Sequence, residues 1–479
     1  VWCLTMAKVE KIVTEVNTEL IGSFKYAHNT VVRLSLVSDE DRERSVNNAC
    51  KKITVKEMTS EVFDKENGLK LISFSEYHAH KRDSDTEGKP QLIYRIKQND
   101  DDFAVMTGLY TGIVNIGKDK LEIKTQCSDL FFRRIINFCC GIYVDIDPSE
   151  TNSDSSGVYS LIVQYLFLVS LRKVAGTNLP KRYVYKKDRD YSIRGNIDIE
   201  RYISNDLASS DKKFSFRYPE RENVQNIIDV LYSAIKECRV EQDALPDILS
   251  VRNYLAENFS GRRPSKYTVN SILKDKILKN SLYANYKKPL QYAQYILNQR
   301  ELNDGNTNKS NSVSGFLVDA SFLWEMYIYN LLKIHLHDWE VNAQEELHFY
   351  EQTFYAKDNY PDFVLRHRLT GEIVVLDAKF KNMKFNGRDV DNADIRQLHG
   401  YSYYYHLQYG DKFKGAGLIY PAKERIPKDK VNVDCMYGID DLAQKFGVFT
   451  VKDPSGDETI IGNEEYFIEE LKLFIGDES

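Results

Sequence analysis

The feature that most constrains the fold is an unbroken apolar run, Ile373–Leu376, that ends at Asp377-Ala378-Lys379. Four consecutive apolar residues without polar alternation are typical of a strand buried on both faces. A turn at Thr370-Gly371 comes before this run, and Asp362–His367 is predicted to be the preceding strand. An ionisable group at the end of a buried strand is costly unless it has a partner. The run therefore predicts a layered domain whose central strand ends at a polar site.

Other predicted elements surround this strand in the C-terminal part of the chain. They are a long apolar helix at Phe316–His335, strands at Gln344–Tyr350 and Glu372–Phe380, a helix at Asn392–Tyr409, strands at Gly417–Tyr420 and Phe446–Val451, and a closing helix at Glu464–Phe474. Helices that alternate with strands in this way predict an α/β layer with a mixed sheet.

The length of 479 residues predicts two or three domains, and we expect an α+β multidomain protein. Residues 301–312 are rich in Asn, Ser, Gly and Asp, which is typical of a linker. We predict an N-terminal region 1–103 of unknown role, a mixed α/β region 104–300, a linker 301–313 and a separately folding domain 314–479. In the second region we expect a hairpin at Gly112–Thr125, strands at Arg182–Tyr185 and Ile193–Ile199, and helices at Asp129–Cys140, Val158–Ala175, Pro219–Cys238 and Asp247–Asn258.

Charge is distributed unevenly along the chain. The formal net charge of −6 indicates no global attraction to nucleic acid. Residues 261–288, however, contain eight Lys and Arg residues and a single acidic residue, with three tyrosines interleaved. This pattern fits either a track for nucleic-acid phosphates or an ordinary solvated helix face, and the sequence leaves both open.

The cysteines and the apolar segments indicate the cellular environment. Seven cysteines without a CxxC pair argue against a disulfide framework and a zinc ribbon, and favour reduced thiols. The longest apolar stretch, near Val158–Leu171, is shorter than the roughly 20 residues of a membrane span. Because no signal peptide is evident either, we expect a cytoplasmic protein without a membrane partner.

Asp362 and Asp377 lie on strands that a turn joins, so a hairpin can bring the two carboxylates together. Such carboxylates repel one another unless a cation lies between them, and oxygen ligands of this kind suit Mg²⁺. Lys379 follows Asp377 by two residues and points to the same face of a strand. Metal, water and lysine are the components of metal-assisted phosphodiester hydrolysis. The alternative is that Asp-x-Lys occurs here by chance, as it does in many proteins.

Three more residues extend this candidate site. Glu325 is a carboxylate inside the apolar helix Phe316–His335, where burying its charge is costly unless it has a partner. Gln397 and Tyr401 are four residues apart and therefore share one helix face. For all three, the alternative is a position on the solvated side of the helix.

Taken in order, Pro361-Asp362, Asp377-Ala378-Lys379 and Gln397-x-x-x-Tyr401 resemble the PD-(D/E)XK nuclease superfamily. More narrowly, the chain resembles the McrC family, the nuclease subunits of McrBC-type and LlaJI-type restriction systems. The similar segments are Asp362–Val364, Ile373–Phe380, Ile395–Leu398, Gly417–Pro421 and, upstream, Gly112–Ile123, Phe131–Phe138 and Ile193–Asp198, where Asn196 replaces a usual basic residue.

The resemblance implies a role for each candidate residue. Asp362 and Asp377 would hold Mg²⁺, with Mn²⁺ as the alternative ion, helped by the backbone carbonyl of Ala378. Lys379 would be the catalytic lysine. The remaining roles would be an auxiliary carboxylate at Glu325 and support of the site or contact with the DNA backbone at Gln397 and Tyr401.

The resemblance also implies an assembly. The chain would be the endonuclease subunit of a GTP-dependent restriction complex that cuts double-stranded DNA. Its N-terminal part, with residues 104–300 as the partner-binding region, would dock in the centre of a hexameric, McrB-like AAA+ GTPase and stimulate GTP hydrolysis there. GTP would be bound by that partner, because this chain has no Gly-x-x-x-x-Gly-Lys-Ser/Thr loop. The alternatives are a stand-alone repair or recombination nuclease and a non-catalytic adaptor of the ring.

Overall fold

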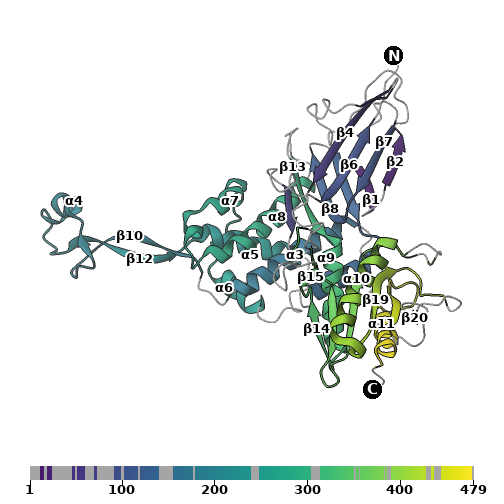
Figure 1. The fold of residues 1–479 in the computed structure, drawn as a ribbon. Coiled ribbons are helices and arrows are strands. Elements are labelled where there is room, and N and C mark those ends of the chain that lie inside the picture. The colour runs from purple at the N-terminus through teal and green to yellow at the C-terminus, as the bar shows by residue number, and fades with distance from the viewer. Residues whose placement is uncertain are drawn as a thin grey trace, which may run out of the picture. The chain divides into compact units, whose positions relative to one another are not determined.

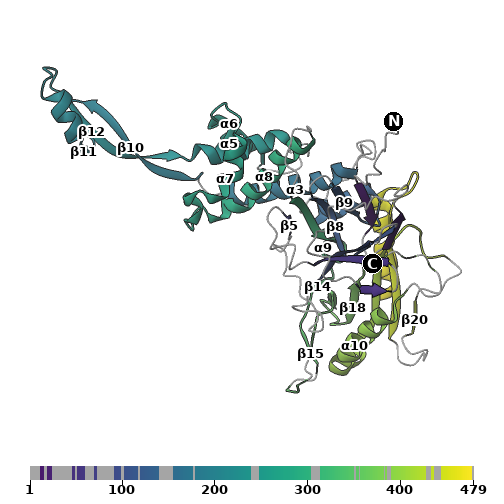
Figure 2. The same ribbon diagram turned by 90° about the horizontal axis from the view of Figure 1, so that it is seen from above.

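The computed structural model describes residues 11–15, 19–23, 46–48, 51–59, 69–72, 91–98, 102–116, 119–139, 155–175, 179–238, 248–303, 313–349, 352–354, 357–381, 383, 385, 390–427, 433–435 and 444–476. The chain divides into two compact units. Unit 1 comprises Val1–Ser153 and Lys309–Ser479, and unit 2 comprises Asp154–Asn308. Figures 1 and 2 show the elements of each. Among the described residues, no helix has the length and apolar character needed to cross a membrane.

A six-stranded mixed sheet forms the C-terminal part of unit 1, in the order β14-β17-β18-β19-β21-β20. β18, β19 and β21 are parallel, whereas β17 and β20 run antiparallel to their neighbours. The predicted mixed sheet is thus present, with the Ile373–Leu376 run at its centre. The strands are β14 (Trp339–Ala343), β17 (Phe363–His367), β18 (Ile373–Ala378), β19 (Phe413–Ala422), β20 (Val433–Cys435) and β21 (Lys445–Lys452).

Helices cover both faces of this sheet. On one face, α10 (Asn392–Tyr409) packs Leu398 and Tyr401 against Ile373 and Val375 of β18. Successive strand residues alternate between faces, so Asp377 lies on the same face as Val375, toward α10. This is why the polar end of β18 and the polar residues of α10 can meet.

The opposite face is covered by α9 (Ala320–His335) and α11 (Ile460–Ile475). Phe449 of β21 packs its ring against Phe467 of α11. The two helices are joined where the Tyr327 hydroxyl donates a hydrogen bond to the Glu464 carboxylate at 2.7 Å. All of these groups are buried.

Two five-stranded sheets lie in the N-terminal part of unit 1, in the orders β1-β9-β8-β13-β5 and β2-β7-β6-β4-β3. The first holds the predicted hairpin and also β13, which directly precedes α9. A two-stranded ribbon, β15–β16, completes the described strands of this unit. The bounds are β1 (Lys11–Glu15), β2 (Glu19–Ser23), β3 (Val46–Asn48), β4 (Lys51–Thr59), β5 (Leu69–Ile72), β6 (Leu92–Gln98), β7 (Asp102–Thr107), β8 (Tyr110–Ile116), β9 (Asp119–Lys124), β13 (Val313–Asp319), β15 (Leu347–Phe349) and β16 (Lys357–Asn359).

The two stretches of chain that form unit 1 are connected by contacts of α2 (Asp129–Cys139) and β8. Arg134 donates two hydrogen bonds to the Glu464 carboxylate, at 2.9 and 2.8 Å, and both side chains are less than 5% exposed. β13 pairs with β8 along seven residues. The expected boundary at residue 314 therefore falls inside unit 1. β8 pairs with β13, and α2 packs against the C-terminal helices.

Unit 2 consists of a helical part and a long two-stranded ribbon that projects from it (Figure 1). In the ribbon, hereafter the arm, ten residues of β10 pair antiparallel with ten of β12. Its tip carries β11, α4 and the turn η3. The elements are α3 (Ser155–Ala175), β10 (Lys181–Asp190), β11 (Asn196–Ile197), α4 (Ile199–Arg201), η3 (Tyr202–Asp206), β12 (Phe214–Asn223), α5 (Gln225–Glu237), α6 (Ile248–Glu257), α7 (Lys266–Ser271) and α8 (Lys287–Asn303).

Several predicted elements begin elsewhere than expected. Residues 219–223 are strand rather than helix, because β12 pairs with β10 before α5 begins. Residues 316–319 belong to β13, and the Asp319 side chain then caps α9 by accepting from the backbone N–H of Ser321. Of the strand expected at Gln344–Tyr350, Leu347–Phe349 form β15, whereas Gln344 lies between β14 and β15. Of the expected linker 301–313, residues 301–303 end α8, Val313 begins β13, and 304–312 lie outside the described residues.

Candidate active site

The end of the β17–β18 pair brings the two predicted aspartates together. Phe363 pairs with Leu376, so Asp362 and Asp377 are the next positions on the two strands. One Asp362 carboxylate oxygen accepts the backbone N–H of Ala378 at 2.7 Å. Asp362 is 9% exposed and Asp377 is 2% exposed. The hairpin geometry expected from the sequence thus places two buried carboxylates at one sheet edge.

Lys379 connects this edge to α10. Its ammonium nitrogen lies 2.6 Å from Oδ2 of Asp377 and donates to Oε1 of Gln397 at 3.0 Å. Gln397 in turn donates from Nε2 to the Tyr401 hydroxyl at 2.8 Å. The structure therefore brings the Asp-x-Lys and Gln-x-x-x-Tyr residues into one chain of polar contacts.

Glu325 reaches the site from α9. It is only 7% exposed, so the alternative of a solvated helix position does not hold. Gln344 donates from Nε2 to the Glu325 carboxylate at 3.2 Å, and its backbone N–H donates to the carbonyl of Asp362 at 3.1 Å. Gln344 has a φ of 51°, a conformation that is uncommon for a residue with a side chain. Gln344 could not be predicted as a site residue, since it lies in a turn and no motif marks it.

The site holds an excess of negative charge away from water. Burial raises the pKa of the Asp362 carboxyl well above its usual value, and repulsion from Asp377 and Glu325 raises it further. Burial lowers the pKa of Lys379, but Asp377 and Asp362 outweigh that effect and raise it overall, so the ammonium form is favoured. Oδ2 of Asp377 is buried and accepts no hydrogen bond from a described residue, its contact with Lys379 being an ion pair. Buried carboxylates in excess over cations fit a divalent metal ion with oxygen ligands.

A second polar network holds α10 against the sheet. The Lys381 ammonium donates to both oxygens of Asp394, at 3.0 and 2.7 Å. The Tyr420 hydroxyl of β19 donates to the same carboxylate at 3.3 Å. Asp394 lies in the first turn of α10, three residues before Gln397, so this network fixes the helix where Gln397 meets Lys379. The sequence analysis missed Asp394 and Lys381; the signal was the second lysine, two residues after Lys379.

One further group of potential ligands lies on the β15–β16 ribbon. Glu346, His348 and Asp358 place ligand atoms within 4.8 Å of one another. The His348 and Asp358 side chains are 48% and 47% exposed and lie 2.8 Å apart. Because exposed groups of this kind are common without a metal, we assign no site to them.

The geometry of the site lies within a stretch that matches a known family. Residues 105–421, more than half of the chain, match the family described as McrBC 5-methylcytosine restriction system component. This chain belongs to that family. The McrBC match includes every candidate residue from Glu325 to Tyr401, and it confirms the family predicted from the motifs.

Two solved structures are similar to the chain, both from Thermococcus gammatolerans. One is a half-complex from a tetradecameric assembly of McrB AAA+ hexamers with bound McrC, with 15% identity, a TM-score of 0.46, and coverage of 96% of this chain and 100% of that chain. The other is a cryo-EM structure of the McrBC complex, with 15% identity, a TM-score of 0.30, and coverage of 68% and 88%. No curated protein matches the chain.

Proposed function

We propose that this chain is the nuclease and activator subunit of a GTP-dependent, McrBC-like restriction complex. It would cleave double-stranded DNA by metal-assisted hydrolysis in a PD-(D/E)XK site and stimulate the GTPase of a hexameric AAA+ partner. The observation that carries the nuclease proposal is the meeting of Asp362, Asp377 and Lys379 at the buried end of β18.

The residues at this edge fit a bound Mg²⁺ ion, or Mn²⁺ as the alternative. Asp362 and Asp377 would hold the ion, with the Ala378 carbonyl as a third oxygen ligand and Glu325 as an auxiliary carboxylate. A bound divalent cation supplies Lewis acidity and lowers the pKa of a coordinated water. A cation between Asp362 and Asp377 would relieve the repulsion that, together with burial, raises the pKa of Asp362.

The neighbouring side chains would position the phosphate and the attacking water rather than bind the metal ion. Lys379 places a positive charge beside Asp377, where it can offset charge on a phosphate and orient the attacking water. Gln397 holds the Lys379 ammonium, and Tyr401 fixes the Gln397 amide in turn. Such a chain of contacts limits the positions that the ammonium can take.

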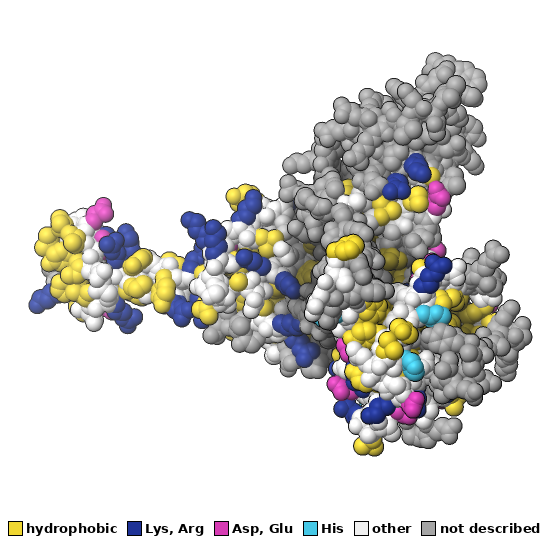
Figure 3. Space-filling view, viewed as in Figure 1, with side chains coloured by type: hydrophobic (Ala, Val, Ile, Leu, Met, Phe, Trp, Pro, Cys, Tyr) yellow, Lys and Arg dark blue, Asp and Glu magenta, His cyan; other side chains and the backbone are white. Residues whose placement is uncertain are grey.

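The arm supports the proposed docking to the AAA+ ring. Ile199, Ile203 and Leu207 at its tip are between 60% and 67% exposed. Figure 3 shows hydrophobic side chains gathered over this end of the arm. An exposed apolar cluster on a projecting element is typical of a surface that another protein covers. The arm also lies within residues 104–300, the region expected to bind the partner.

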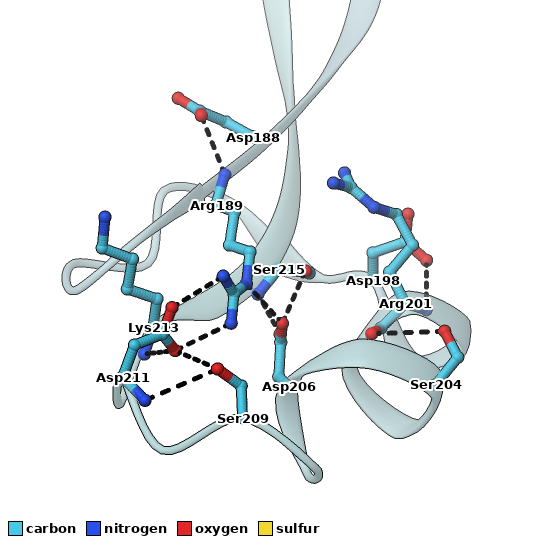
Figure 4. A network of polar contacts seen from close by, with 10 residues as sticks. All are labelled: Asp188, Arg189, Asp198, Arg201, Ser204, Asp206, Ser209, Asp211, Lys213 and Ser215. Atoms are coloured by element: carbon cyan, nitrogen blue, oxygen red, sulfur yellow. Dashed lines mark hydrogen bonds and ion pairs between the residues drawn. The ribbon is translucent and has the colours of Figure 1, made fainter.

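A network of ion pairs between Arg189, Asp206 and Asp211, hereafter the charged node, holds the arm tip in one conformation (Figure 4). Arg189 donates to Asp206 at 2.7 Å and to both oxygens of Asp211 at 2.8 Å. Asp206 also accepts hydrogen bonds from the backbone and side chain of Ser215. A preorganised tip loses less conformational entropy when it docks.

The decisive experiment replaces one proposed metal ligand. Asp377→Asn should abolish plasmid cleavage in the presence of the AAA+ partner, GTP and Mg²⁺, because a buried ligand charge is removed. It should leave stimulated GTP hydrolysis at the wild-type rate. The matched control is Asp338→Asn, an exposed aspartate that follows α9 and should change neither readout.

Each alternative predicts a different result. Cleavage at the wild-type rate by Asp377→Asn would remove the proposed site. Efficient cleavage by the wild-type chain without any AAA+ partner would favour a stand-alone nuclease. Stimulation of GTP hydrolysis without cleavage by the wild type would favour a non-catalytic adaptor.

A further inference from the structure

One strongly charged surface of unit 2 has no part in the proposed site. It consists of the eight basic residues of the segment 261–288, all of them exposed, and we call it the basic surface: Arg262, Arg263, Lys266, Lys274, Lys276, Lys279, Lys287 and Lys288. The single acidic residue of the segment, Asp275, is already engaged, because Arg182 donates to its carboxylate at 2.9 Å. The surface is therefore more positive than the sequence alone indicates.

The backbone beneath these cations is firmly held. After α7, the segment forms three short turns, η5 (Ile272–Lys274), η6 (Lys276–Lys279) and η7 (Ala284–Tyr286), before α8 begins. Each turn has a buried residue, Ile272, Leu278 and Tyr286 respectively, and the lysines of η5 and η6 are exposed. Figure 3 shows Lys and Arg side chains gathered over the helical part of this unit. The cations thus have a fixed spacing, not that of a flexible tail.

The cations of the basic surface are poorly compensated within the protein. Among the described residues, Lys274, Lys276, Lys279 and Lys287 make no ion pair, and Arg263 lies 3.6 Å from Glu237. On the adjoining α3, burial lowers the pKa of Lys173, and the positive charge of Lys288 lowers it further. Like charges that approach in this way favour a bound anion, which would relieve their repulsion.

The amino-acid composition of the basic surface indicates which class of anion it would bind. Six of its eight cations are lysines, which act as point charges and tolerate many geometries. Protein partners usually require buried aromatic or apolar anchors at the centre of an interface. Two of the three tyrosines in the segment, Tyr283 and Tyr286, are buried in the protein's own core instead. An extended array of lysines suits the regular phosphates of a duplex, which it can contact without reading sequence.

We infer that the basic surface binds the phosphate backbone of duplex DNA, as a contact additional to the cutting site in unit 1. The inference rests on the proposed function in that it takes DNA as the substrate. A sequence-independent contact of this kind would hold the DNA while the nuclease site and the partner act on it.

The test measures binding of the full-length chain to a fluorescent duplex without metal, so that no cleavage occurs. The variant carries Lys274→Gln, Lys276→Gln and Lys279→Gln. If these lysines contact phosphates, the slope of log K against log salt should become shallower by about 2–3, and the affinity at low salt should fall at least about tenfold. The matched control carries Lys333→Gln, Lys412→Gln and Lys414→Gln in unit 1, and its slope should equal that of the wild type.

Other outcomes overturn the inference. A wild-type slope in the Lys274, Lys276 and Lys279 variant would show that the basic surface does not bind DNA. If polyglutamate displaces the duplex as well as unlabelled DNA of equal charge does, the surface fits an acidic protein instead. The proposed nuclease is tested separately: a failure of the wild type to cut DNA with Mg²⁺ and the AAA+ partner would refute the nuclease while leaving the salt slope intact.

Discussion

Lys379 lies between an acid that it neutralises and an amide that positions it. Asp377 and Gln397 approach the same ammonium from β18 and α10, and each of the three would be misplaced without the other two. At the scale of single residues, the site thus depends on contacts between two elements that are separated along the chain.

Replacing Lys379 tests this arrangement. Lys379→Ala should slow DNA cleavage by at least ~10²-fold, the usual scale for losing a positioned proton-transfer or charge-stabilising group. The readout is single-turnover cleavage with Mg²⁺ and the AAA+ partner, and thermal unfolding verifies that the variant is folded. Lys412→Ala, at the opposite end of the sheet, is the control. A loss of less than about threefold would remove Lys379 from the mechanism.

At the scale of elements, the arm shows how a ribbon can be ordered without a core of its own. Ten consecutive residue pairs connect β10 and β12, and most β10 side chains are exposed. A charged network contributes to the stability of the tip: burial raises the pKa of Asp206, but hydrogen bonds from Arg189 and Ser215 outweigh this effect and lower it overall.

Arg189→Ala should weaken stimulation of the partner's GTPase while leaving DNA binding by the isolated chain unchanged. The reason is that Asp206 and Asp211 lose their shared partner and the tip no longer presents one conformation. Arg201→Ala, a nearby arginine without an ion pair among the described residues, is the control. Equal stimulation by the Arg189 variant and the wild type would exclude the node from partner activation.

At the scale of the whole molecule, unit 1 is built from two distant stretches of chain. β13 pairs with β8, and Arg134 of α2 is buried against Glu464 of α11. A separate C-terminal fragment would remove Arg134 from the buried Glu464 carboxylate, and breaking such an ion pair typically costs about 3–5 kcal/mol.

The fragment 314–479 should therefore fail to fold stably, although it contains every candidate active-site residue. A chain in which a Gly/Ser linker replaces residues 154–308 should retain unit 1 and unfold cooperatively. Circular dichroism during heating distinguishes the two. A cooperative transition of the 314–479 fragment near that of the internally deleted chain would show that β8 and α2 are dispensable.

The local elements and the motif follow from patterns within short stretches of the chain. The apolar run that forms β18, the helix Asn392–Tyr409 and the aspartates at the strand ends were all recognisable. Burial on both faces and helical spacing leave regular patterns over a few residues, and the geometry of a hairpin follows from its turn. These patterns were enough to predict that Asp362, Asp377 and Lys379 would meet.

Long-range packing, by contrast, places the distant residues that complete the site and unit 1. Gln344 reaches Glu325 and Asp362 from a turn with positive φ, and Asp394 reaches Lys381 across the sheet edge. Residues 316–319 form a strand because they pair with β8. Their apolar pattern continues without a break into α9, so the sequence alone favours a longer helix. Such contacts join residues far apart in sequence, and they depend on how complete elements pack, for which no short stretch of chain carries a pattern.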